Sequence, residues 1–160
     1  MGVSVDHRTF VITRDLPGGT GHAFRFWSDH RLKRLWSACH PDWQVTEDHF
    51  DFRMGGSERL IWRTPSGTEH AMLAHYLDIS PRQRIVYAYA MRSGERSISS
   101  SLVTVEFTGA AGGTIMTFTE QAVFNDARDG DFRESGTGVG FERLREVMAA
   151  SLMRGAASAE

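Results

Sequence analysis

The chain has 160 residues, 41% of them hydrophobic and 24% charged, which excludes a disordered polypeptide and leaves room for one domain but not two. The 18 Lys and Arg against 20 Asp and Glu give a formal net charge of −2, without the basic excess of a dedicated nucleic-acid binder. We therefore expect a single domain over residues 1–160 with a core from about 8 to 152.

One cysteine, Cys39, leaves no intramolecular disulfide to form, which suits a reducing compartment. The N-terminus lacks the basic and continuous apolar regions of a signal peptide, and no apolar run approaches the ~20 residues that span a bilayer. We expect a cytoplasmic protein with no membrane or nucleic-acid partner, and a homodimer stays open.

The first element in the chain is a strand over His7–Arg14, with Phe10 and Ile12 on one side. Pro17-Gly18-Gly19 ends it, and Thr20 can cap the short helix that follows.

Two short helices are predicted next. The apolar face of the first carries Ala23, Phe24 and Trp27. The second runs from about His30 to Trp36, and its apolar side carries Leu32, Leu35 and Trp36. The basic residues between them are interpreted as its solvated face: Arg31, Lys33 and Arg34.

From Trp43 the hydrophobic pattern changes to period two, which indicates strands. Six are predicted, at about Trp43–Phe52, Ser57–Thr64, Glu69–Ile79, Arg84–Met91, Ser97–Phe107 and Thr114–Phe124. Their short links favour antiparallel neighbours, because a parallel crossover needs a dozen or more residues.

A polar stretch from Asp126 to Ser135 precedes a last amphipathic helix. Its apolar stripe is Phe141, Leu144, Val147 or Met148, and Leu152. The opposite, polar side is Glu142, Arg143, Arg145 and Glu146. The stripe must be buried, and the concave face of a curved sheet is the obvious place, so the fold class is α+β.

Four segments, in this order, resemble the AHSA1-like (activator of Hsp90 ATPase homologue-like) branch of the START/Bet v 1 (SRPBCC) superfamily. They are Leu35-Trp36, Asp51–Gly56 (DFRMGG), Ala74–Tyr87 (AHYLDISPRQRIVY) and Gly112-Gly113-Thr114. The resemblance implies the helix-grip fold, in which a seven-stranded antiparallel sheet grips the C-terminal helix and two short helices close one end. The sequence departs from the family at Ser37–Pro41 and in the glycine-rich segment Gly136–Gly140.

Strand alternation places bulky side chains on the inner face of the sheet. On one interpretation Trp62, Tyr87 and Tyr89 line a cavity for an amphipathic guest; on the other they are ordinary core aromatics. The candidate ligand-binding residues are Trp36, Trp43, Trp62, His75, Tyr87, Tyr89 and Glu120.

His75 and Glu120 stand out as ionisable residues on faces that are otherwise apolar. The strand over Glu69–Ile79 is expected to turn inward Leu73, His75, Leu77 and Ile79. A buried Glu120 needs an explanation, because an unpaired buried carboxylate is unfavourable by several kcal/mol. It is a ligand anchor or acid/base, a structural partner of Arg53 or His75, or on a misassigned face.

No catalytic or metal site is predicted. The seven histidines are scattered without ligand spacing, Cys39 stands alone, and no nucleophile elbow or phosphate loop is present, so we expect no metal and no cofactor. Together with the resemblance, this favours non-enzymatic binding of a small hydrophobic or aromatic molecule. A polyketide cyclase/dehydratase-like enzyme using the same cavity and a chaperone-regulating interaction module are the alternatives.

Overall fold

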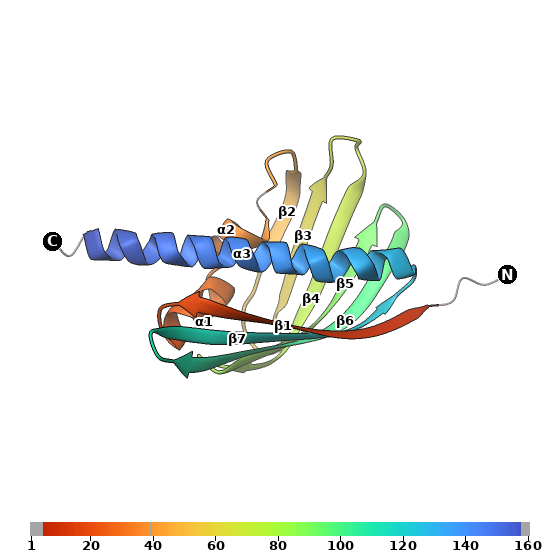
Figure 1. Ribbon diagram of the computed structural model, residues 1–160. Helices are drawn as coiled ribbons and strands as arrows, with labels where there is room; N and C mark the ends of the chain where they lie inside the picture. Colours follow the sequence, from red (N-terminus) through yellow and green to blue (C-terminus); the bar gives the residue numbers. More distant parts are fainter. Residues whose placement is uncertain (1–4, 39, 158–160) are drawn as a thin grey trace.

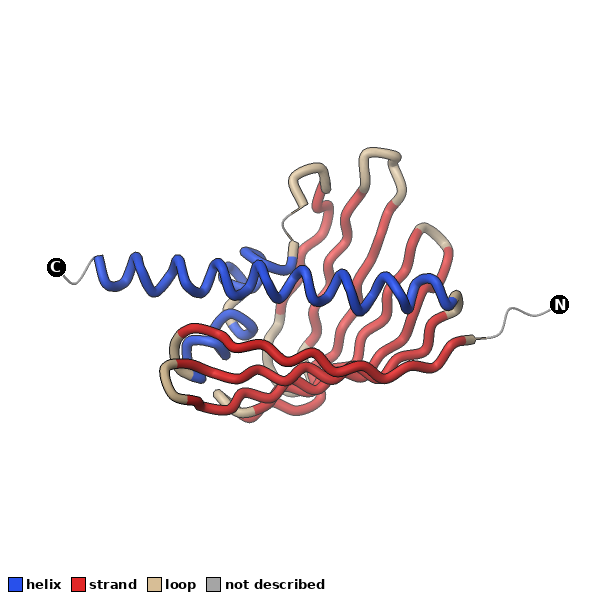
Figure 2. Tube along the Cα trace, in the orientation of Figure 1, coloured by secondary structure: helices blue, strands red, loops and turns tan. Residues whose placement is uncertain are grey.

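The computed structural model describes residues 5–38 and 40–157 as a curved antiparallel sheet with three helices (Figures 1 and 2). The elements are β1 (Asp6–Pro17), α1 (Thr20–Ser28), α2 (His30–Ser37), β2 (Gln44–Phe50), β3 (Ser57–Arg63), β4 (Glu69–Ser80), β5 (Arg84–Ser93), β6 (Arg96–Ala110), β7 (Gly113–Phe124) and α3 (Ala127–Ala157). Cys39, on which the expected redox compartment depends, lies outside the described residues.

The sheet has the order β1-β7-β6-β5-β4-β3-β2, and every neighbouring pair is antiparallel. Strands β2 to β7 form a meander, and β1 pairs with β7 from Asp6 opposite Phe124 to Pro17 opposite Gly113. Figure 1 shows α3 crossing the concave side of this sheet, with α1 and α2 at one end. The predicted seven-stranded helix-grip fold is therefore confirmed.

The core lies where α1, α2 and the second half of α3 meet the concave face. Its largest buried side chains include Phe26, Trp27, Phe118 and Phe141, whose rings lie within 5.0–6.4 Å of a neighbour. The predicted inner residues of β1, β3, β5 and β7 are confirmed as buried or half-buried: Phe10, Ile12, Leu60, Trp62, Ile85, Tyr87, Tyr89, Met91, Met116, Phe118, Glu120 and Phe124.

Helix α3 begins about nine residues earlier than the polar stretch suggests, at Ala127. The Asp126 carboxylate accepts from the backbone N–H of Arg128 and satisfies a free donor of the first turn. Arg8 of β1 then donates to Asp131 and to the carbonyl of Ala127, which ties these polar turns to the sheet. Within the described residues no helix, α3 included, is long and apolar enough to cross a membrane.

The short helices differ from prediction in the faces that they bury. In α1 the glycine at position 19 occupies the N-cap, so Thr20 is not the cap, and Phe26 is buried more deeply than Phe24. In α2 Leu35 is 37% exposed while Lys33 is only 7% exposed. The physical reason lies in the sheet, which offers Lys33 an acidic partner that helix periodicity alone cannot indicate.

The inner face of β4 is the reverse of the predicted one over most of the strand. Ala74 and Tyr76 are buried, whereas His75 and Leu77 are exposed. A bulge between Tyr76 and Asp78 changes the alternation, so Ile79 alone of the predicted set packs on the core. The remaining member of that set, Leu73, pairs across the sheet with Arg59, which is exposed.

Gly55 and Gly56 bond to the backbone of β4 at this bulge. The N–H of Gly55 donates to the carbonyl of Tyr76 at 2.8 Å, and the N–H of Tyr76 donates to the carbonyl of Gly56 at 3.0 Å. This turn leaves no room for a side chain at position 56, because a Cβ atom there would clash with the carbonyl of Asp51.

We expect Gly56→Ala to lower the free energy of unfolding by roughly 2 kcal/mol, because the backbone of residues 51–53 must move to admit a methyl group. Urea denaturation measures the change. Gly109→Ala is the matched control, since a Cβ atom at Gly109 meets no other atom within 4 Å. Equal stability of the two variants would contradict the close approach at Gly56.

Candidate functional site

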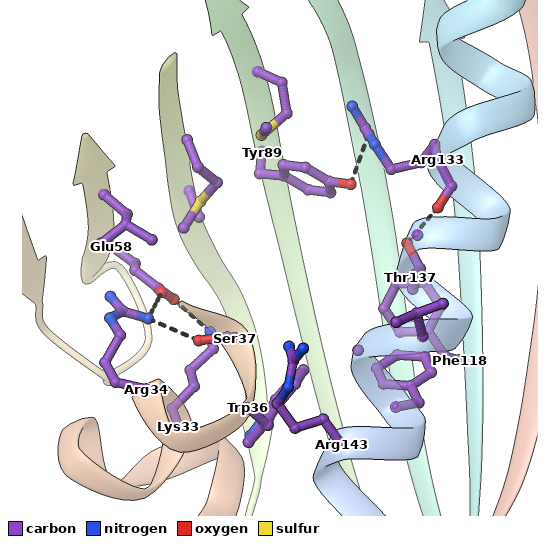
Figure 3. A pocket seen from close by; sticks show the side chains of 18 of the residues that line it. Lys33, Arg34, Trp36, Ser37, Glu58, Tyr89, Phe118, Arg133, Thr137 and Arg143 are labelled. Atoms are coloured by element: carbon purple, nitrogen blue, oxygen red, sulfur yellow. Dashed lines mark hydrogen bonds and ion pairs between the residues drawn. The ribbon is translucent and has the colours of Figure 1, made fainter. Parts of the chain in front are cut away.

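A cavity of about 470 Å³ lies between the concave face of the sheet and α3, a volume within the range of small-molecule sites. The sheet contributes mostly apolar side chains: Leu60, Trp62, Met72, Tyr87, Met91 and Phe118. Helix α2 and the segment after it close one end with Trp36 and Trp43. Figure 3 shows α2, the sheet and α3 around this space.

Six of the seven residues predicted to bind a ligand line this cavity: Trp36, Trp43, Trp62, Tyr87, Tyr89 and Glu120. The seventh, His75, does not, because it lies on the exposed face of β4. Its predicted position on the cavity wall is wrong, since the inner face of β4 carries Ala74 and Tyr76 instead. That the other six contact a ligand stays a prediction.

Trp43 and Trp62 belong to a stack of four rings from the segment before β2 and from β3 and β4. His40 lies against Trp43 at 5.3 Å between centroids, Trp43 against Trp62 at 5.0 Å, and Trp62 against His70 at 5.5 Å. The interplanar angles are 15–22°. Offset stacking fixes the ring planes, so the tryptophans present a rigid aromatic wall to the cavity.

Glu120 is fully buried, and three side chains donate to it. The single proton of the Tyr89 hydroxyl is shared between the two oxygens of this carboxylate at 3.0 and 2.8 Å, Ser101 Oγ donates at 2.7 Å, and Arg133 Nη1 donates at 3.0 Å. The alternative in which Glu120 pairs with Arg53 or His75 is therefore wrong. Burial and the charge of Glu120 raise the pKa of Tyr89, so this hydroxyl stays protonated and acts as a donor.

Arg133 joins the first half of α3 to the sheet. Besides Glu120, it donates to the hydroxyl of Tyr89 at 2.7 Å (Figure 3). It also donates to Ser99 Oγ at 2.7 Å. The sequence analysis missed it because it placed residue 133 before the helix. A helix extended back to Ala127 puts Arg133, Thr137 and Gly140 on one face by three- and four-residue spacing.

A second buried carboxylate, Glu58, lies at the other end of the cavity and is 2% exposed. Lys33 Nζ donates to one oxygen, to which the Tyr76 hydroxyl also donates at 2.6 Å, and Arg34 Nη1 donates to the other oxygen at 2.7 Å. The interpretation of Lys33 and Arg34 as a solvated face is therefore wrong, and it holds only for Arg31, which is exposed. Arg34 also pairs with Asp48 at 2.8 Å.

Four aromatic rings surround the ammonium group of Lys33 at 5.5–5.8 Å: those of Trp27, Phe50, Tyr76 and Tyr87. The ring faces add cation–π attraction to the ion pair with Glu58. Burial alone would raise the pKa of Glu58, but the charges of Lys33 and Arg34 outweigh it and hold this pKa below its ordinary value. Glu58 was within reach of sequence analysis, because it alternates with Leu60 and Trp62 and must share their inner face.

Helix α3 presents glycine to the cavity at two positions one turn apart, Gly136 and Gly140. A Cβ atom at either position would meet no other atom within 4 Å. The glycines thus leave open part of the space that side chains of α3 would otherwise occupy. In the described ranges no group of three or more His, Cys, Asp or Glu residues has the arrangement of a metal site.

We expect Glu58→Gln to lower the free energy of unfolding at pH 7 by about 3 kcal/mol or more, because it removes the charge that balances two buried cations. Since the pKa of Glu58 is lower in the folded state than its ordinary 4.5, its stabilising contribution is present above about pH 4.5 and is lost as pH falls through the folded value. The difference between wild type and variant should therefore narrow on acidification.

Urea denaturation from pH 7 down to pH 3 measures this difference. The control is Glu47→Gln, which breaks an ion pair with Arg59 whose side chains are 44% and 51% exposed, so its effect should stay below about 1 kcal/mol. A Glu58→Gln variant as stable as this control would show that the buried ion pair does not stabilise the fold.

Comparison with known proteins places this arrangement in a family. The profile of the family described as "Activator of Hsp90 ATPase homolog 1-like protein" matches residues 21–149. No match to the chain is found among the curated proteins.

Several solved structures share the fold. An uncharacterized protein from Rhizobium leguminosarum is 45% identical, with a TM-score of 0.87 over 92% of this chain and 97% of that one. The Mll3558 protein from Rhizobium loti is 38% identical, with a TM-score of 0.83 over 89% of this chain and 98% of the other. Protein CV1439 from Chromobacterium violaceum is 20% identical, with a TM-score of 0.72 over 88% of this chain and 96% of that one. At this identity the likeness is one of fold alone. The profile match and the two rhizobial relatives show that this chain belongs to the AHSA1-like family of the SRPBCC/Bet v 1-like superfamily.

Proposed function

We propose that this protein binds a small hydrophobic or aromatic molecule in the cavity between the sheet and α3, without catalysing a reaction. The observation that carries the proposal is the open space itself: about 470 Å³ with a wall of aromatic and aliphatic side chains. A core that served stability alone would be close-packed, because unfilled apolar space lowers the free energy of unfolding.

The glycines of α3 support the same proposal. Glycine in the interior of a helix is less favourable than alanine by about 1 kcal/mol, so Gly136 and Gly140 weaken the helix at the places where they widen the cavity. Such a local loss of stability is typical of a functional site. The aromatic stack of Trp43 and Trp62 offers a flat surface on which an aromatic guest can pack.

The chemistry of the wall favours binding over catalysis. A general acid or base works best when its pKa lies near the working pH, whereas the pKa of Glu58 is held below its ordinary value. Both carboxylates already accept hydrogen bonds from the protein. Glu58 accepts from Lys33, Arg34 and Tyr76, and Glu120 accepts from Tyr89, Ser101 and Arg133. Neither is therefore poised to accept a proton from a guest.

The neutral fluorophore N-phenylnaphthylamine tests the proposal, because its emission rises when it leaves water for an apolar site. We expect saturable binding to one site in the wild type and an affinity at least about tenfold lower in Gly140→Leu, whose side chain projects into the cavity. Fluorescence titration measures both, and native mass spectrometry gives the stoichiometry.

Gly155→Leu is the matched control, because it makes the same change in the same helix at an exposed position outside the cavity. Leucine favours helix over glycine, so neither variant should unfold more easily than the wild type. Equal affinity of Gly140→Leu and Gly155→Leu would place the probe elsewhere, and no binding by the wild type would overturn the proposed function.

A further inference from the structure

The cavity wall carries more positive than negative charge, although the chain as a whole has a formal charge of −2. Four cationic side chains line it: Lys33, Arg34, Arg133 and Arg143. Three carboxylates carry the opposite charge. Glu58 and Glu120 line the cavity, and Asp48 lies beside it, paired with Arg34. Four positive charges against three negative ones leave a local excess of +1.

Arg143 carries this excess. The other three cations each pair with a carboxylate at 3.0 Å or less, whereas within the described residues the Arg143 guanidinium makes no hydrogen bond or ion pair. Figure 3 shows its side chain extending away from α3 into the region of the cavity residues Trp36 and Phe118, with no partner drawn to it. The sequence predicts Arg143 on the polar side of this helix, opposite the apolar stripe. The structure places it half-buried on the face that borders the cavity, together with Gly136 and Gly140.

Within the described chain, two hydrogen-bond donors on the wall remain free. The hydroxyl of Tyr87 has no hydrogen-bond partner among the described residues, and burial raises its pKa, so it stays protonated. The indole N–H of Trp62 likewise has no acceptor in the part of the chain that the structure describes. Each of the two lining carboxylates, by contrast, already accepts from three side-chain donors.

We propose that the ligand is an amphipathic organic acid, whose apolar or aromatic body fills the cavity and whose single anionic group pairs with the Arg143 guanidinium. This inference rests on the proposed function and adds the chemical class of the ligand to it. A planar guanidinium suits a carboxylate or sulfonate, because two parallel N–H donors can reach two oxygens at once. An anion there cancels the excess charge of the wall, while a cationic guest would add to it.

Two fluorescent probes with one ring system test the inference. N-phenylnaphthylamine is neutral, and anilinonaphthalene sulfonate adds one negative charge to the same rings. We expect wild type to bind the sulfonate at least about tenfold more tightly than the neutral probe, and we expect Arg143→Met to abolish that preference. The preference is the ratio of the two Kd values within one variant, so a change in affinity that affects both probes equally cancels. Arg143→Lys should keep part of the preference, because it retains the charge but not the paired donors.

Arg145→Met is the matched control, because it removes the same charge two residues further along α3 from a side chain outside the cavity wall. It should keep the tenfold preference, which separates a local ion pair from a general effect of net charge. Circular dichroism and thermal unfolding of each variant establish that it is folded before its affinities are compared.

The outcomes separate the two proposals. Binding of the neutral probe without a preference for the sulfonate, or a preference that survives in Arg143→Met, overturns the inference and leaves the proposed function standing. Loss of the preference in Arg143→Met but not in Arg145→Met supports the inference. Failure of the wild type to bind either probe overturns the proposed function and the inference with it.

Discussion

The carboxylate of Glu58 holds α2 against the sheet. It accepts hydrogen bonds from Lys33 and Arg34 of α2 and from Tyr76 of β4, so one side chain of β3 joins three elements. Apolar contact alone would allow α2 to slide over the sheet, because hydrophobic attraction has no preferred direction. The directed ion pairs fix its position and with it Trp36, which closes one end of the cavity. The space under α3 therefore depends on a polar interaction inside an otherwise aromatic core.

Helix α3 is held in two different ways along its length. Its second half packs through Phe141, Leu144 and Met148 into the core, as apolar periodicity predicts. The prediction is wrong for Leu152, which is exposed because the helix has by then passed the core. The first half of α3 is joined to the sheet by two long cationic side chains. Arg8 of β1 donates to Asp131 and to the carbonyl of Ala127. Further along the helix, Glu120 of β7 accepts from Arg133. A short apolar residue at this position would require the helix to approach the sheet and close the cavity. A long cationic side chain with a buried acid opposite keeps the two surfaces apart.

Most of the fold could be predicted from the sequence, because period-two alternation and turn residues fix seven strands and their antiparallel order. The errors have local physical causes. In β4, a bulge after Tyr76 changes the alternation, so His75 lies on the outer face of the sheet and not on the predicted inner face. In α3, contacts from Arg8 to Asp131 and Ala127 extend the helix through a segment whose composition indicates a loop. The aromatic part of the site was predictable, since bulky residues alternate with small ones on β5. In its polar part, strand alternation indicates the buried carboxylates Glu58 and Glu120. It cannot indicate their partners, because helix spacing does not show that Lys33 faces Glu58 or that Arg133 faces Glu120.

Because the free volume borders two glycines of α3, the size of the cavity can vary among relatives without any change in the sheet. Alanine, serine or valine at positions equivalent to Gly136 and Gly140 would reduce the volume in steps of one or a few atoms, since nothing lies within 4 Å of either Cβ position. The seven strands have to conserve their register, whereas two helix positions are free to diverge. The residues found at these two positions in a homologue should therefore indicate how large a guest that homologue accepts.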